Sequence, residues 1–302
     1  MKCLVTGGAG FIGSNLALEL KKLGNEVVIV DNFLSGNKEN LKGFDGKFIE
    51  ADVSDNGFSI NGKFDVIFHQ AAITDPRHPN DSETYEKNIN GFKNIIKLAE
   101  KNNAKLIYAS TAGLYGNGKV PMQEGQEKEI LSAYGKSKLE MDKMAEKLFQ
   151  KMHIVGLRYF NVFGPREKYK QRAASMVYHL AKQIKQGKRP RIFKFGEQKR
   201  DHIYVKDAVD ATIKAVGAKK SCIVNVGTGI ATTFNDLIIA LNDAMGTNFE
   251  PEYFDMPYDS KTYQANTQAD TNKAEKLIGF KSKWLLKEGI KDYIKWLGAN
   301  GW

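Results

Sequence analysis

A tyrosine and a lysine four residues apart, Tyr134 and Lys138, form the pattern in this sequence that most directly suggests chemistry. Residues at this spacing lie on one face of a helix, one turn apart. A nearby ammonium group stabilises a phenolate, so we expect Tyr134 to exchange protons near neutral pH instead of near its free pKa of about 10. The Thr111 hydroxyl follows an expected strand over 105–109, which places it at the carboxyl edge of a sheet, where ligands bind.

Three glycines, Gly7, Gly10 and Gly13, have the spacing G-x-x-G-x-x-G between an expected strand and an expected helix. Glycine allows a tight turn, close approach to a pyrophosphate and packing of the helix on the sheet. The helix N-terminus then presents free N–H groups and a positive dipole to phosphates. Asp31 ends the next strand, at roughly the 20-residue interval expected for an acid that binds the adenosine ribose.

The choice between NAD and NADP depends on two charged residues. The Asp31 carboxylate repels a 2′-phosphate and accepts hydrogen bonds from a free ribose diol, which favours NAD. Lys38, in the following loop, either neutralises a 2′-phosphate or is a solvated loop lysine. The sequence leans to NAD, with NADP as the alternative.

The elements that must position these residues alternate along the first half of the chain, which predicts a parallel sheet with crossover helices. We expect strands over 2–6, 26–31, 47–50, 64–69, 105–109, 153–158, 191–195 and 223–226, and helices over 13–23, 83–102, 134–151, 173–186, 233–245 and 286–297. The expected fold is α/β, a Rossmann-type doubly wound parallel sheet with a smaller C-terminal α/β substrate lobe. We expect a cofactor domain over 1–164 and mainly the substrate lobe over 165–302, with some segments returning to the first domain.

Composition narrows the partners. The formal net charge is +10, but the lysines are scattered along expected helices and loops, often beside acids, as on a solvated helix face. The denser cationic stretch, 185–199, suits a small polyanion at least as well as a duplex, so nucleic acid is the weaker interpretation. No apolar run approaches the length of a bilayer, and the glycine turn follows the first residues too closely for a signal peptide, so we expect a cytoplasmic protein. Neither Cys3 and Cys222 nor the histidines have metal-ligand spacing, and no metal is expected.

Over essentially its whole length, the sequence resembles the extended short-chain dehydrogenases/reductases. The resemblance implies that Thr111 hydrogen-bonds the reacting sugar oxygen, that Tyr134 is the acid/base, and that Lys138 tunes Tyr134 and holds the nicotinamide ribose of a tightly bound NAD or NADP. The implied cofactor-binding residues are Gly7, Gly10, Phe11, Ile12, Gly13, Asp31, Asn32, Lys38, Asp52, Val53, Ala71, Ala72, Asn88, Tyr134, Lys138 and Val162. Asp52 as a turn acid, and Asn88 as a helix polar residue, are the structural alternatives.

The dehydratases of this family carry an Asp-Glu pair directly after the threonine, as acid and base for elimination of water. Ala112 and Gly113 stand there in this sequence and cannot transfer protons. A dehydratase is therefore disfavoured.

Two later stretches, 158–170 and 262–270, resemble the ADP-glycero-manno-heptose 6-epimerases, a branch of the family. This resemblance implies a redox-neutral cycle in which the C6 hydroxyl is oxidised to a 6-keto intermediate and re-reduced on its other face. Inversion needs proton transfer at two faces, which Tyr134 and Lys170 would provide. The implied substrate-binding residues are Thr111, Asn161, Arg172, His179, Phe193, Arg200 and Tyr263.

Alternatives remain for several of these residues. Lys170 could be a surface lysine or a diphosphate contact, Arg200 could form a structural salt bridge with Asp201, and His179 could be structural. The competing functions are a UDP-hexose 4-epimerase and a non-catalytic NAD(P)-binding sensor on the same fold. We expect a nucleotide-diphosphate sugar as the partner and a homo-oligomer that binds neither nucleic acid nor membrane.

Overall fold

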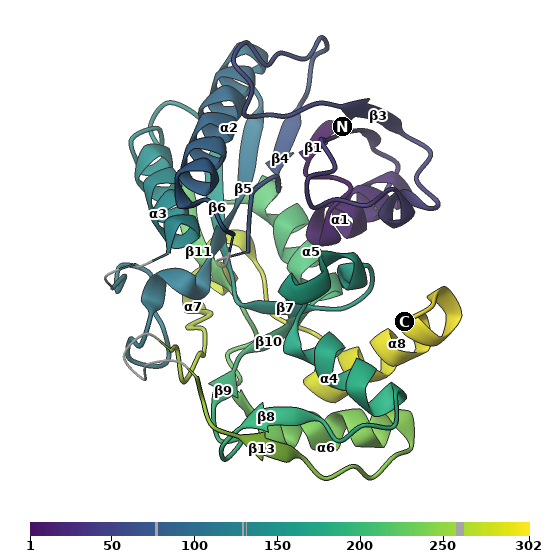
Figure 1. The fold of residues 1–302 in the computed structure, drawn as a ribbon. Coiled ribbons are helices and arrows are strands. Elements are labelled where there is room, and N and C mark those ends of the chain that lie inside the picture. Colours follow the sequence, from purple (N-terminus) through teal and green to yellow (C-terminus); the bar gives the residue numbers. More distant parts are fainter. Residues whose placement is uncertain (76–77, 129, 131, 258–262) are drawn as a thin grey trace.

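The large sheet has seven parallel strands, in the order β11-β6-β5-β4-β1-β2-β3 (Figure 1). Their bounds are β1 Lys2–Thr6, β2 Glu26–Asp31, β3 Lys47–Glu50, β4 Val66–His69, β5 Lys105–Thr111, β6 Ile154–Tyr159 and β11 Cys222–Val226. Several of these strands are continuous apolar runs, because helices cover both faces of the sheet. The structure, a computed structural model, describes residues 1–302 except 76–77, 129, 131 and 258–262.

Two helix layers cover the sheet. The helices are α1 Phe11–Lys22, α2 Asp81–Asn102, α3 Ala133–Glu146 and α5 Val205–Lys214. Side chains of α1 and α5 share one hydrophobic core with Val5 and Ile29. Those of α2 and α3 share a second core with Leu4 and Val30, which point to the opposite face of the same strands. Strand order reverses between β1 and β4, which is where a doubly wound sheet opens a ligand crevice at its carboxyl edge.

The remaining elements form a second region beyond this edge of the sheet (Figure 1). They comprise the parallel pairs β7 Asn161–Phe163 with β10 His202–Tyr204 and β8 Arg191–Phe193 with β13 Glu252–Phe254, the antiparallel pair β9 Lys199–Arg200 with β12 Thr232–Thr233, and the helices α4 Met176–Lys185, α6 Phe234–Met245 and α8 Leu286–Asn300. Short 3-10 segments are η1 Lys38–Leu41, η2 Ala112–Tyr115, η3 Glu167–Ala173 and η4 Ala215–Gly217. Because α5 packs on the large sheet, β11 is one of its strands and α7 Asn272–Ile278 contacts β11, the chain returns to the large sheet after residue 164.

Several helices differ from the sequence prediction. The helix expected over 134–151 ends at Glu146, after which the chain continues in tighter turns, with Lys151 N–H bonded to Leu148 O at 2.8 Å. The helix expected from residue 173 begins at Met176, because Ser175 caps it and η3 precedes it. Helices α5 and α7 were not predicted.

Among the described residues there is neither a helix that could span a membrane nor a cluster of metal-binding side chains. None of their helices has the length and apolar character needed to cross a membrane. Within the same part of the chain, no three His, Cys, Asp or Glu side chains gather as a metal site would require.

Candidate active site

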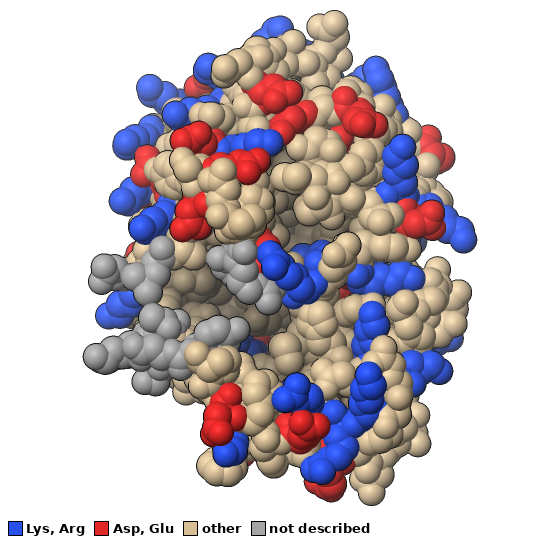
Figure 2. All heavy atoms as spheres, in the orientation of Figure 1, with Lys and Arg blue, Asp and Glu red and all other residues tan. Residues whose placement is uncertain are grey.

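A cavity of about 1140 Å³ lies between the carboxyl edge of the sheet and the second region. Figure 2 shows the surface hollowed there, with basic side chains beside the hollow. Most of the predicted site residues line this cavity, namely Gly7, Gly10, Phe11, Ile12, Gly13, Asp31, Asn32, Asp52, Val53, Ala71, Ala72, Asn88, Thr111, Tyr134, Lys138, Asn161, Val162, Lys170, Arg172, Phe193, Arg200 and Tyr263. The fold therefore brings residues from both halves of the chain to one site.

Two predicted site residues are not among those that line it. Lys38 begins η1, and its ammonium lies 5.3 Å from the centroid of the Phe33 ring. His179 is half-buried in α4, with its ring 5.8 Å from that of Tyr178.

The glycine turn leaves no room for side chains. Gly7 has φ +67°, and a Cβ there would lie 2.6 Å from Ala71 N. A Cβ on Gly13 would lie 2.1 Å from Gly7 O. Gly10 is the N-cap of α1 and provides no side-chain cap, so the first N–H groups of the helix are available to a ligand. This cradle fits the pyrophosphate of a dinucleotide.

Asp31 is a buried acid at the end of β2. One carboxylate oxygen accepts a hydrogen bond from Ala9 N at 2.9 Å and the other from Phe33 N at 2.8 Å. Burial raises the pKa of Asp31, and these two hydrogen bonds oppose the rise. Each oxygen keeps a second lone pair, so the carboxylate fits a ribose diol as well.

Asp52 follows β3 and is fixed from three sides. Its carboxylate accepts hydrogen bonds from Ser54 Oγ at 2.6 Å, Asn32 Nδ2 at 3.0 Å and Lys87 Nζ at 3.3 Å. Burial alone would raise the pKa of Asp52, but the Ser54 and Asn32 hydrogen bonds and the Lys87 charge hold it below its ordinary value. The carboxylate therefore stays ionised at the cavity wall.

Asn88 uses its amide within the protein. Its Oδ1 accepts a hydrogen bond from Ile73 N at 2.8 Å, and its Nδ2 donates to Ile73 O at 3.1 Å and to Ser137 Oγ at 3.0 Å. Asn88 thus ties the loop after β4 to α3, beside the predicted catalytic pair.

The predicted catalytic pair is adjacent in the structure. Lys138 is buried, donates from Nζ to Ala109 O at 2.8 Å and lies 5.9 Å from the centroid of the Tyr134 ring. Burial lowers the pKa of Lys138 to about 8. The expected near-neutral pKa of Tyr134 is wrong for the ligand-free protein, because burial raises it and the hydrogen bond with Thr111 only partly opposes this.

Lys170 enters the cavity from η3. Its side chain is half-buried, with Nζ 5.8 Å from the centroid of the Phe11 ring. Burial lowers the pKa of Lys170, while the charges of Glu167 and Asp75 oppose this. The more exposed Arg172 donates from Nε to Asp75 Oδ2 at 2.8 Å and so ties η3 to the loop after β4.

Glu167 holds the segment that carries Lys170. Its fully buried carboxylate accepts hydrogen bonds from Gly164 N at 3.0 Å and Ser175 N at 2.7 Å. The two ends of η3 are thereby joined through one side chain.

Aromatic rings and a guanidinium form the far wall of the cavity. The Phe193 ring contacts those of Phe254 and Tyr263, with centroids 4.9 and 5.6 Å away. The Arg200 guanidinium lies 5.1 Å from the Tyr263 ring and donates to Ala265 O at 2.9 Å. Burial lowers the pKa of Arg200, and the hydrogen bond with Tyr263 opposes this.

The structural alternative for Arg200 was a salt bridge with Asp201. The buried carboxylate of Asp201 accepts hydrogen bonds from Thr228 N, Thr228 Oγ1, Gly229 N and Ala269 N, at 2.7–3.0 Å. The Asp201 carboxylate therefore fixes the backbone around residues 228–229 and 269.

Asn161 is exposed, and its Oδ1 accepts a hydrogen bond from Thr267 Oγ1 at 3.2 Å.

Several cavity residues were missed by the sequence analysis. Gln70, His202, Phe234 and Phe254 line it without belonging to a motif, and Tyr159 lies in the 158–170 stretch without having been assigned a role. Only Phe254 had a usable signal, as part of a short aromatic run after Pro251 that pairs with β8.

Comparisons with known proteins agree with this geometry. The sequence profile of the NAD dependent epimerase/dehydratase family matches residues 3–227. The chain is 36% identical to an ADP-L-glycero-D-manno-heptose-6-epimerase of Brachyspira hyodysenteriae, over 99% of this chain and 98% of the relative. It is also 36% identical to a putative UDP-glucose 4-epimerase of Methanocaldococcus jannaschii, over 98% of each.

A solved structure is similar over the same extent. The Helicobacter pylori ADP-L-glycero-D-manno-heptose-6-epimerase superposes with a TM-score of 0.92 at 37% identity, over 99% of this chain and 96% of that one. The chain therefore belongs to the NAD-dependent epimerase/dehydratase family and is an NAD-dependent epimerase, an isomerase.

Proposed function

We propose that this epimerase inverts C6 of ADP-glycero-manno-heptose, by transient oxidation to a 6-keto sugar and re-reduction on the opposite face. The observation that carries the proposal is that Tyr134 and Lys170, far apart in the sequence, line one cavity. Inversion by this route needs a proton-transferring group on each face of the reacting carbon.

The cofactor side of the cavity would hold NAD throughout the cycle. Gly7, Gly10 and Gly13 would shape the pyrophosphate cradle, and Asp31 would accept hydrogen bonds from the adenosine ribose. When bound, NAD supplies the hydride acceptor and donor and, in its oxidised form, a positive charge that favours the Tyr134 phenolate. Because the cofactor returns to its starting redox state in each cycle, tight binding without exchange suits this chemistry.

Tyr134 is proposed as the first acid/base. Thr111 shares a hydrogen bond with Tyr134 and would orient the reacting hydroxyl toward it. The Lys138 ammonium, anchored on Ala109 O, would place positive charge beside the forming phenolate. The phenolate then accepts the proton that the sugar hydroxyl loses on oxidation.

Lys170 is proposed as the second acid/base. Burial lowers its pKa toward the range in which an amine both accepts and donates protons, which a surface lysine does not do near neutral pH. Its place beside Phe11, at the start of α1, keeps it close to the cofactor cradle.

The far wall is proposed to bind the nucleotide half of the substrate. The Arg200 guanidinium can donate two parallel hydrogen bonds to a diphosphate. Phe193 and Tyr263 offer ring faces and edges to a base. Asn161 and Arg172, also at the cavity, would contact the sugar and phosphates. A nucleotide-sugar substrate agrees with the cytoplasmic location expected from the sequence.

A UDP-hexose 4-epimerase is the second candidate. The putative UDP-glucose 4-epimerase of M. jannaschii is as similar in sequence as the B. hyodysenteriae enzyme. Such an enzyme would use the same cofactor cradle and the same Tyr134, so the two candidates differ in how Lys170 and the far wall are used.

The deciding experiment incubates purified protein with ADP-D-glycero-D-manno-heptose, without added cofactor, and follows the C6 epimer ratio by NMR. A parallel reaction contains UDP-glucose and is followed for C4 inversion. Conversion of the heptose alone supports the proposal and shows that the cofactor co-purifies. Conversion of UDP-glucose alone, with NAD and NADP also tried on the heptose, would replace it by the second candidate.

A further inference from the structure

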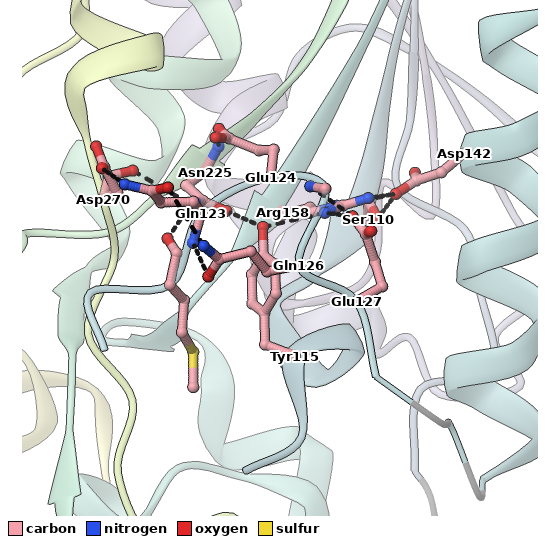
Figure 3. Close-up of polar contacts among 12 residues, drawn as sticks. Ser110, Tyr115, Gln123, Glu124, Gln126, Glu127, Asp142, Arg158, Asn225 and Asp270 are labelled. Atoms are coloured by element: carbon pink, nitrogen blue, oxygen red, sulfur yellow. Dashed lines mark hydrogen bonds and ion pairs between the residues drawn. The ribbon is translucent and has the colours of Figure 1, made fainter. Parts of the chain in front are cut away.

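A buried ion pair stands directly behind the predicted catalytic pair. Arg158, on β6, donates from Nε and Nη2 to the same oxygen of Asp142, on α3, at 3.0 and 2.8 Å (Figure 3). The two residues are 3% and 2% exposed. Charges removed from water this completely are retained only with full hydrogen bonding, and a hydrophobic pair is often as stable.

The carboxyl end of β5 is joined to α3 through three successive residues. Tyr108 OH donates to Asp142 Oδ1 at 2.9 Å, and Ser110 Oγ donates to Asp142 Oδ2 at 3.1 Å. Between them, Ala109 O accepts the hydrogen bond of Lys138 Nζ. Asp142 and Lys138 are thus fixed against the same short piece of strand, which leads directly into Thr111.

Tyr134, Lys138 and Asp142 follow one another at intervals of four residues on α3. Side chains at this spacing lie on one face of a helix. The face that presents the phenol to the cavity therefore continues inward through an ammonium to a carboxylate.

The guanidinium of Arg158 is fixed on its other side as well. Nη1 donates to Tyr115 OH at 3.0 Å and to Glu127, and the guanidinium stacks over the Tyr115 ring at 5.3 Å. Tyr115 OH in turn donates to Asn225, on β11, at 2.6 Å (Figure 3). Neither Arg158 nor the carboxylate it holds can turn away without breaking several buried hydrogen bonds.

The groups that face Lys138 come from every element around it. Burial lowers the pKa of Lys138, and the charge of Asp142 opposes this. His69, on β4, has its pKa lowered to about 3, and burial raises the pKa of Tyr108, on β5, well above its ordinary value. Both are therefore neutral at pH values where the epimerase would be assayed. Tyr134, which lines the cavity, is the third neutral group near Lys138. The charged groups are Asp142 and Arg158, which form an ion pair with each other.

We propose that Asp142, held by Arg158, Ser110 and Tyr108, is a positioning residue that fixes a negative charge one helical turn from Lys138 and keeps Lys138 in register with the end of β5. The inference rests on the roles proposed above for Tyr134 and Lys138. Its chemistry is a fixed negative charge one helical turn beyond the ammonium, with no proton or electron transferred at Asp142 itself.

Asp142→Asn tests the charge while keeping the shape. Activity that needs the Lys138 ammonium is present below the pKa of that group and is lost as the pH rises through it. Without the carboxylate charge that pKa falls, so the alkaline limb of the pH–rate profile should move down by about one pH unit. The matched control is Glu146→Gln, an exposed carboxylate one turn further along α3, which should leave the limb unmoved.

The double variant Asp142→Asn/Arg158→Met addresses folding. Asp142→Asn alone leaves a buried guanidinium without its carboxylate, whereas the double variant removes both charges. Because Asp142 is the charge that raises the pKa of Lys138, the limb should still move down in the double variant, though less. Two results would overturn the proposal and leave Asp142 a purely structural residue. One is an alkaline limb that does not move in any variant lacking the Asp142 carboxylate, and the other is a limb that Glu146→Gln moves by the same amount.

A second measurement does not depend on turnover. The Lys138 side chain is titrated by NMR in ligand-free protein labelled at lysine ε-carbons, with Lys138→Met to assign the signal. Its midpoint should lie lower in the double variant than in the wild type, and an unchanged midpoint contradicts the inference. Absence of turnover on any sugar nucleotide, with the midpoint lowered, would contradict the proposed function and leave the role of Asp142 standing.

Discussion

The two walls of the cavity are built in different ways. The wall proposed to hold the cofactor contains the glycine turn, Asp31, Asp52 and Asn88, and we call it the cofactor wall. Its acids and amides are hydrogen-bonded to the backbone or to neighbouring side chains, as when Asp31 accepts hydrogen bonds from Ala9 N and Phe33 N. The far wall, proposed to bind the substrate and called the substrate wall below, is formed by Phe193, Tyr263 and Arg200. These residues contact one another through ring–ring and guanidinium–ring contacts. The first wall is shaped by the path of the chain, and the second by the side chains it carries.

This difference suggests how each wall recognises its ligand. A backbone cradle with glycines that cannot accept a Cβ suits one ligand that remains bound through every cycle. Rings and a guanidinium can be exchanged without altering the fold, so that wall is where sugar nucleotides would be distinguished. The two proposed acid/base groups line the same cavity, Tyr134 on α3 and Lys170 on η3.

Tyr134→Phe should have the largest effect. Removing the phenol oxygen removes the proposed acid/base, and we expect epimerisation to fall by roughly 10³-fold. The cofactor should remain bound at the wild-type ratio, because the cradle and Asp31 are untouched. The C6 epimer ratio by NMR and the cofactor content of the purified protein check the two parts. Full activity in this variant would contradict the mechanism.

Lys170→Met should come next. We expect slow oxidation and re-reduction to persist while inversion falls by roughly 10²-fold, since one face loses its proton donor. Absorbance of the reduced nicotinamide reports the redox steps, and the NMR epimer ratio reports inversion. Lys182→Met, at an exposed lysine on α4, is the control. Wild-type inversion in Lys170→Met would make Lys170 structural or a diphosphate contact.

The cofactor wall was the more predictable from sequence, for a physical reason. Its chemistry is local: Gly7, Gly13 and the β1–α1 turn lie within a few residues, and Asp31 follows at the next strand end. The strands of the large sheet were predicted for the same reason, since runs buried on both faces are continuously apolar. Helix α5 was missed although its buried residues Val205, Ala208, Val209 and Thr212 recur at helical spacing.

The groups behind the site could not be predicted. Asp142 and Arg158 belong to a helix and a strand that meet only through tertiary packing, and nothing in their spacing pairs them. The pKa of Tyr134 was misjudged because the sequence shows the neighbouring Lys138 but not the burial that outweighs it. Phe254 had a signal in the aromatic run after Pro251, but its place at the cavity depends on the pairing of β13 with β8, which the sequence does not show.

Arg200→Lys sharpens the comparison on the substrate wall. A lysine keeps the charge but loses the fork that binds a diphosphate and the stacking on Tyr263. We expect KM for the sugar nucleotide to rise about tenfold, with kcat nearly unchanged. Steady-state kinetics measure both, and Arg189→Lys, an exposed arginine bonded to Glu250 O, is the control. A kcat effect alone would place Arg200 nearer the reacting carbon than the diphosphate.

Lys38→Ala should have the smallest effect and tests the cofactor wall. The sequence left open whether Lys38 neutralises a 2′-phosphate, and the structure places its ammonium against the Phe33 ring, outside the cavity lining. The loss of one surface cation should change the affinities for NAD and NADP by less than about twofold. Apoprotein titrated with each dinucleotide measures this. A selective loss of NADP affinity would show that the loop between Phe33 and Lys38 rearranges around the cofactor, and that this wall is less fixed than its hydrogen bonds indicate.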